Sequence, residues 1–81
     1  MNEGWFTKPV SVAVGVVGDA RYIISARQAA AMLAEHWPAK GTLKHRDALV
    51  ACQDAQHGPK SGDMARASFV EAALEARVLI D

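Results

Sequence analysis

The N-terminal region of this chain alternates valine with small residues, and this pattern constrains the fold more than any other feature of the sequence. The valines stand at every second position: Val10, Val12, Val14 and Val16. A period of two in β-branched residues predicts a strand with one buried face, and Pro9 fits at its first residue. Gly18 and Asp19 mark a turn, and residues 21–25 (RYIIS) predict a second strand that completes a β-hairpin.

A lone hairpin is marginally stable in water, so it must pack against other elements of the chain. The remaining sequence predicts three helices for this purpose. The first begins at Ser25, which forms a capping-box pattern with Gln28, and it ends near His36 because Pro38 follows.

Local signals also bound the second and third helices. Thr42 suits the N-cap of the second helix, which runs to about His57 before a Gly-Pro stop. The third helix begins around Ser61, with Asp63 in its first turn, where negative charge is favourable. Each helix carries an apolar stripe at helical spacing. The stripes comprise His45, Ala48, Leu49, Cys52 and Ala55 on the second helix, and Ala65, Phe69, Ala72, Ala73 and Ala76 on the third.

The chain closes with three aliphatic residues, Val78, Leu79 and Ile80, which predict a short strand after the third helix. Pairing of this strand with the hairpin would give a three-stranded sheet. We therefore expect an α+β fold with the order ββαααβ and with the helices on one face of the sheet. The expected core comprises Val10, Val12, Val14, Ile24, Leu33, Trp37, Leu49, Cys52, Phe69, Ala73 and Leu79.

Length and composition indicate one domain over residues 1–81, because 81 residues leave no room for two. Nine basic and nine acidic side chains cancel, which disfavours a surface that coats nucleic acid. The single cysteine excludes an intrachain disulfide and favours a reducing, cytoplasmic setting. No segment reaches the roughly 18 apolar residues that span a bilayer, so we expect no membrane association and no targeting segment.

The sequence lacks a constellation that we would assign to catalysis. Cys52 lies on an apolar stripe, where a buried and unreactive thiol is expected. His45 lies seven residues before it, about 10.5 Å along a helix, which is too far for a shared zinc ion. We interpret Ser25 and Ser61 as helix caps rather than nucleophiles. We therefore expect no enzymatic activity, no metal site and no cofactor.

Positive charge gathers at the start of the second helix. The candidate anion-binding residues are Lys40, Lys44, His45 and Arg46, with Trp37 just upstream as a stacking face. Free amides at a helix start, together with cations, can hold a phosphate, a carboxylate metabolite or, weakly, a nucleic-acid backbone. The alternative is a polar face of long, solvated side chains, and both interpretations stay open.

The predicted sheet has open edges, where a second copy of the chain could pair. Residues 1–46 carry six basic and three acidic side chains, a net charge of +3, and residues 47–81 carry three and six, a net charge of −3. Opposed patches of this kind favour self-association. The expected function is therefore a non-enzymatic, homodimeric protein-interaction module, with the binding of an anionic ligand or nucleic acid as the alternative.

An ordered set of residues along the chain also has a counterpart in a known family. The set comprises Pro9-Val10, Ala29-Ala30, Trp37-Pro38, His45, Ala48, Cys52, Ala55, Gly58, Ala65-Arg66, Phe69, Ala72-Ala73 and Glu75-Ala76. From roughly Trp5 to Ile80, the chain resembles domain of unknown function 982, a family of small proteins from rhizobia and other alphaproteobacteria. Its members often have glycine where this chain has Arg77. Glycine at this position suits a helix C-cap in the left-handed region. The resemblance implies the fold and leaves the activity open.

Overall fold

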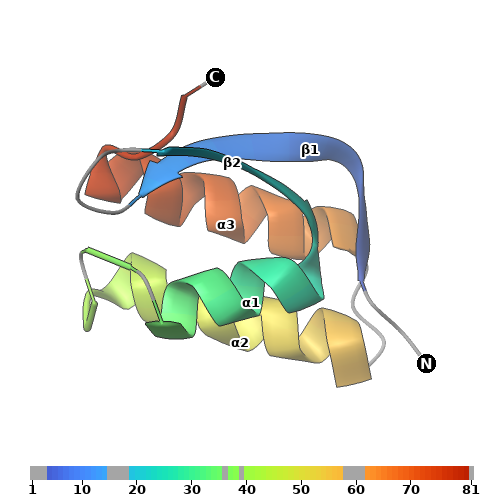
Figure 1. Cartoon of the computed structure of the whole chain (residues 1–81). Coiled ribbons are helices and arrows are strands. Elements are labelled where there is room, and N and C mark those ends of the chain that lie inside the picture. Colours follow the sequence, from blue (N-terminus) through green and yellow to red (C-terminus); the bar gives the residue numbers. More distant parts are fainter. Residues whose placement is uncertain (1–3, 15–18, 36, 39, 58–61, 81) are drawn as a thin grey trace.

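A computed structural model of the chain describes residues 4–14, 19–35, 37–38, 40–57 and 62–80. The elements are β1 (Trp5–Val14), β2 (Asp19–Ser25), α1 (Ala26–Glu35), α2 (Leu43–His57) and α3 (Gly62–Ala76). The antiparallel sheet of β1 and β2 forms one layer, with α3 packed against β1 and α1 against β2, while α2 packs on these two helices on the side away from the sheet (Figure 1). The predicted α+β class, the hairpin and the three helices are confirmed.

The register between the two strands determines which hydrophobic side chains enter the core. Val10 lies opposite Ile23, and Val12 lies opposite Arg21. Directly opposed side chains point to the same face of a sheet, so Ile23 is buried together with the two valines. Ile24 points to the other face and is 39% exposed. The prediction that Ile24 belongs to the core is therefore wrong, and Ile23 takes its place.

Strand β1 begins at Trp5, earlier than the valine pattern predicts. The register shifts between the Trp5–Ser25 pair and the Val10–Ile23 pair, which are five residues apart on β1 and two apart on β2. Pro9 lies in this irregular stretch rather than at the first residue of the strand, and there its missing N–H interrupts no regular ladder.

The irregular stretch of β1 is attached to α3 through one carboxylate. The backbone N–H and the hydroxyl of Thr7 both donate to Oδ1 of Asp63, at 3.1 and 2.9 Å. Asp63 lies in the first turn of α3, as predicted. Ser61, Val16 and the side chain of Val14 lie outside the described residues, so their predicted roles have no structural counterpart here.

The C-terminal segment does not form the predicted third strand. Leu79 makes one isolated antiparallel bridge with Val12. Two hydrogen bonds flank this bridge, from Ala13 N to Val78 O at 2.8 Å and from Ile80 N to Ser11 O at 2.9 Å. The described order of elements is therefore ββααα rather than ββαααβ.

The end of α3 sets the path of the last residues. Arg77 has a φ of 60°, in the left-handed region. Val78 N donates to Ala73 O at 3.0 Å, and Arg77 N donates to Leu74 O at 3.2 Å, which together form a Schellman motif. This cap turns the chain sharply toward the sheet, where Val78 and Ile80 each make one hydrogen bond with β1 on either side of the bridge at Leu79.

The two predicted N-caps that lie among the described residues, Ser25 and Thr42, are present. The hydroxyl of Ser25 accepts from Gln28 N at 3.2 Å, and that of Thr42 accepts from His45 N at 3.1 Å. The capping box of α1 closes one residue early, because Oε1 of Gln28 accepts from the N–H of Ile24 rather than from that of Ser25.

The core lies between the sheet and the helices, and alanine supplies most of the helix surfaces that meet there. Of the predicted core, Leu33, Trp37, Cys52, Phe69 and Ala73 are buried, whereas Leu49 and Leu79 are only partly buried. Met32 and Val78 are also buried and were not expected there. Small side chains let the three helices approach one another closely beneath a sheet of only two strands.

Candidate functional site

His45 connects the end of α1 to the start of α2. Its side chain is buried, with 8% exposed, and its Nε2 lies 2.8 Å from the carbonyl oxygen of Leu33. Since a carbonyl can only accept, Nε2 carries the hydrogen. The N–H of Gly41 faces Nδ1 at 3.5 Å, so both ring nitrogens are directed at main-chain groups. His45 therefore has a structural role at this corner of the fold.

Two polar contacts join the start of α2 to α3. Nζ of Lys44 lies 2.9 Å from Oε1 of Glu71, and the hydroxyl of Thr42 donates to Oε1 of Glu75 at 2.6 Å. The hydrogen bond and the charge of Glu71 raise the pKa of Lys44 above its usual value. The Lys44 and Glu71 side chains are 49% and 60% exposed, so water and salt screen their attraction.

Trp37 lies in the core rather than at the surface. The side chain is 4% exposed, and its ring packs against Phe69 with centroids 5.4 Å apart and planes inclined at 48°. Its Nε1 is buried without a hydrogen-bond partner among the described residues. Stacking of a ligand on this ring would require the core to open.

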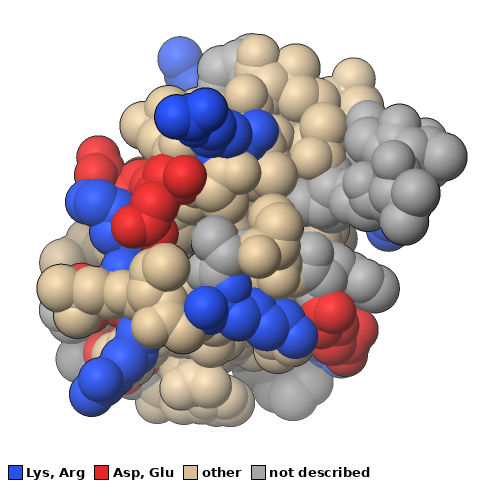
Figure 2. Space-filling model, turned by 90° about the vertical axis from the view of Figure 1, so that its left-hand side faces the viewer, with Lys and Arg blue, Asp and Glu red and all other residues tan. Residues whose placement is uncertain are grey.

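The five predicted anion-binding residues thus divide into two groups. Lys40, Lys44 and Arg46 are exposed at one end of the molecule, whereas Trp37 and His45 are buried. On the face shown in Figure 2, acidic and uncharged side chains separate the basic ones, so the cations form no continuous patch. Anion binding at the start of α2 stays a prediction.

Cys52 has the surroundings of an inert thiol. Its side chain is fully buried on α2, and burial raises the pKa of its thiol to about 12. A thiol with such a pKa carries almost no thiolate near neutrality. Within the described part of the chain, no three His, Cys, Asp or Glu side chains are grouped as a metal site would require.

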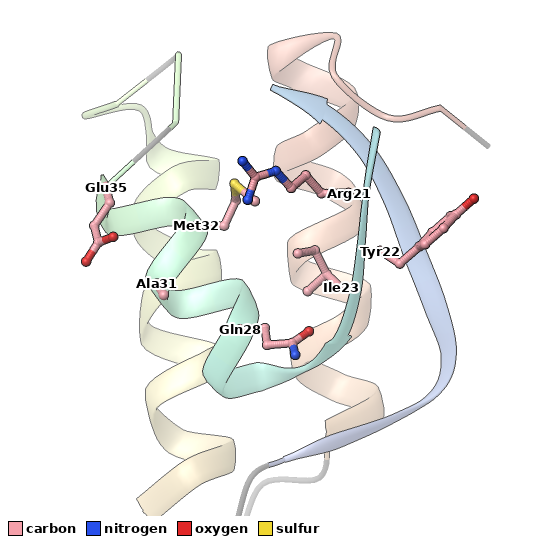
Figure 3. Close-up of a pocket in the computed structure, with 7 residues that line it drawn as sticks. All are labelled: Arg21, Tyr22, Ile23, Gln28, Ala31, Met32 and Glu35. Atoms are coloured by element: carbon pink, nitrogen blue, oxygen red, sulfur yellow. The ribbon is translucent and has the colours of Figure 1, made fainter. Parts of the chain in front are cut away.

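A groove that the sequence did not predict lies between β2 and α1 (Figure 3). Its volume is about 360 Å³, within the range of ligand and peptide pockets. Arg21 and Met32 extend toward each other across it, whereas Tyr22 points away, toward the uncovered face of the sheet. The remaining lining residues are Ile23, Gln28, Ala31 and Glu35. A signal for this groove in the sequence is Arg21, a charged residue within a segment that is otherwise typical of a strand.

The alternation of backbone groups along β1 shows which residues bond to β2. Ser11 O and Ala13 N bond to the C-terminal segment. Successive residues of a strand direct their N–H and C=O groups to opposite sides. Val10 and Val12 therefore direct theirs toward β2.

The same alternation identifies the free edge of β2. Arg21 and Ile23 pair with Val12 and Val10, so they face β1. The N–H and C=O groups of Ala20 and Tyr22 then point away from the sheet. No strand among the described residues pairs with this edge. An unpaired row of main-chain donors and acceptors is a template for another strand.

Fold and site together define a class: a small α+β protein in which a hairpin packs on a group of three helices, with no partner strand among the described residues along part of the β2 edge. None of the described helices is both long and apolar enough to cross a bilayer. The chain belongs to the family described as Protein of unknown function (DUF982), whose profile matches residues 8–80. Comparison with curated proteins finds no match, and comparison with solved structures finds none either.

Proposed function

We propose that this chain is a non-enzymatic protein-interaction module that binds by strand addition at the free edge of β2 and self-associates through it. The observation that carries the proposal is the outward-facing main chain of Ala20 and Tyr22, with the Tyr22 side chain 72% exposed beside it. In strand addition, main-chain hydrogen bonds provide affinity and neighbouring side chains provide specificity.

The edge of β2 is only partly protected: Oε1 of Gln28 accepts from the N–H of Ile24 at its end, whereas the main chain of Ala20 and Tyr22 has no such cover among the described residues. Proteins protect such edges with lysine, proline, bulges or a covering segment. On β1, Pro9 and the register shift interrupt the strand, and the bridge at Leu79 occupies its outer edge. On β2, Ala20 and Tyr22 direct their main chain outward and carry no charge, whereas the N–H of Ile24 is already held by Oε1 of Gln28. An edge of this composition suits a partner strand.

The positions of the reactive side chains support the non-enzymatic part of the proposal. The thiol of Cys52 is buried with a raised pKa, and both ring nitrogens of His45 face main-chain groups. Both side chains are also buried, whereas nucleophilic or acid–base chemistry would require them to be exposed to a substrate. As part of the same proposal, we assign the protein to the cytoplasm, where a lone thiol stays reduced.

Sedimentation velocity of the wild type and of Tyr22→Pro, from about 1 µM to about 500 µM, tests the proposal over the range of weak to moderate affinities. Because the N–H of Tyr22 points away from β1, proline there removes no bond of the hairpin, and circular dichroism should confirm the fold. We expect the wild type to associate with rising concentration and Tyr22→Pro to stay monomeric.

Tyr22→Thr is the matched control, because threonine keeps the N–H and the β-propensity but lacks the ring. It should still associate, which separates the main-chain contribution from that of the aromatic side chain. A wild type that is monomeric at every concentration, or association that is unchanged in Tyr22→Pro, would overturn the proposal.

A further inference from the structure

We infer that the partner of β2 is β2 of a second copy and that helix α1 completes the interface, around a two-fold axis passing near Tyr22 and Ala31. The inference rests on the strand addition proposed above and names the surfaces that meet. Three observations carry it: the register available to the strand, the level of α1 relative to β2, and the charges along α1.

The first observation is the set of outward-facing groups on β2. An axis at Tyr22 pairs this residue with its own copy through two hydrogen bonds, and it sets Ala20 opposite Ile24. Because the N–H of Ile24 is held by Oε1 of Gln28, that outer pair adds at most one hydrogen bond, from Ala20 N to Ile24 O. On the groove side, Arg21 then lies opposite Ile23. An axis shifted to Arg21 would place the two Arg21 side chains opposite each other, and opposed like charges are destabilising. An axis shifted to Ile23 would pair Tyr22 with Ile24, whose N–H is held by Gln28.

The second observation is that β2 and α1 bring Tyr22 and Ala31 to the same level. Tyr22 precedes Ser25 by three residues, about 10 Å of strand. Ala31 follows Ser25 by six residues, about 9 Å of helix. Since α1 turns back alongside β2, one axis can pass both residues (Figure 3).

The third observation is the pattern of side chains on the exposed face of α1. An antiparallel pair of α1 helices centred on Ala31 sets Gln28 opposite Ala34 and Arg27 opposite Glu35. All five residues are exposed. The alanines allow close approach of the two helices, and each copy places a cation beside an anion of the other. The groove between β2 and α1 lies inside this contact and is covered by the second copy.

The size of the surface sets the expected affinity. Strand β2 has 7 residues and α1 has 10, so fewer than 17 residues of each copy can meet. Stable interfaces use about 20–30 residues on each side. We therefore expect a reversible dimer with a dissociation constant in the micromolar range, about 1–100 µM.

Sedimentation equilibrium of the full chain tests this interface with a charge swap. Arg27→Glu and Glu35→Arg should each weaken dimerisation about fivefold or more, because each places like charges together twice per dimer. The double variant, which restores opposite charges, should return most of the affinity. Thermal unfolding at low concentration identifies any variant whose monomer is itself destabilised.

A bulky substitution on α1 provides the second arm. Ala31→Arg should abolish the dimer while keeping the helix, and Ala67→Arg, at an exposed alanine of α3, should leave dimerisation unchanged. Association that is lost in Tyr22→Pro but insensitive to Ala31→Arg and to the charge swap would overturn this interface and leave strand addition standing. A wild-type chain that stays monomeric would overturn both.

Discussion

The buried thiol of Cys52 should make the protein lose stability above about pH 9. Its side chain is fully buried, and burial raises the pKa of the thiol from 9.0 to about 12. The thiolate therefore forms far more readily in the unfolded chain than in the folded one. Stability that is fully present below pH 9 is lost as the pH rises toward 12, by about 1.4 kcal/mol for each pH unit.

The loss of stability caused by ionisation of Cys52 in the unfolded chain is large enough to measure. At pH 10, one unit above the pKa of the free thiol, the loss is about 1.4 kcal/mol. For a chain of 81 residues, the total free energy of unfolding is about 4–12 kcal/mol. This single group should therefore remove a substantial fraction of the stability at pH 10.

The assay is urea unfolding of the wild type and of Cys52→Ala between about pH 7.5 and pH 10.5, a range that brackets the free thiol pKa. Alanine leaves a small cavity, which lowers stability by the same amount at every pH. Other groups titrate in both proteins and cancel in the difference. We expect the difference in the free energy of unfolding to narrow by about 1.4 kcal/mol by pH 10.

A thiol reagent supplies the second measurement at neutral pH. Because the side chain must become exposed before it reacts, labelling of native Cys52 should be about a thousandfold slower than labelling in urea. Parallel pH profiles of stability for the two proteins, or labelling of native Cys52 at the rate seen in urea, would show that the thiol is not sequestered in the folded protein. Rapid labelling of the native protein would also make Cys52 a candidate nucleophile.

Two further predictions concern the ends of the helices. Arg77 forms the left-handed cap of α3 with a φ of 60°, a conformation that glycine adopts without the steric cost of a Cβ atom. The Arg77→Gly variant should therefore have a free energy of unfolding about 0.5–1 kcal/mol higher than that of the Arg77→Ala variant. Equal urea midpoints for these two variants would contradict a strained cap. His45→Phe should lower the free energy of unfolding by about 1–3 kcal/mol, because it leaves the Leu33 carbonyl without its donor. The His45→Gln variant, which keeps an N–H donor, should recover part of that loss of stability in the same urea titration. Equal losses of stability in the two variants would show that the hydrogen bond to Leu33 is unimportant.

Sequence reasoning succeeded where the determinants are local. Alternating valines identified β1, and the side chains of Ser25 and Thr42 cap α1 and α2 as predicted. The buried stripe on α2 also follows the predicted spacing, with Leu49 only partly buried. Periodicity and capping involve residues within a few positions of one another, so the linear order contains the information needed.

Reasoning failed where the answer depends on the alignment of distant segments. Whether Ile23 or Ile24 is buried depends on the register of the hairpin, because a shift by one residue exchanges the buried and exposed faces of a strand. Trp37 was predicted both in the core and as a stacking face for a ligand, and its packing against Phe69, 32 residues further along the chain, decided for the core. The groove beside β2 was missed for the same reason, because it exists only between a strand and the helix that turns back beside it.

The amino-acid order alone was enough to define a hairpin followed by three helices, because hydrophobic period, caps and breakers act within a turn or a strand. Tertiary packing determined the rest. It set which isoleucine is buried, it left the C-terminal residues with a single bridge to β1, and it left the edge of β2 open. These outcomes depend on how segments far apart in sequence align in space, and local propensity carries no information about that alignment.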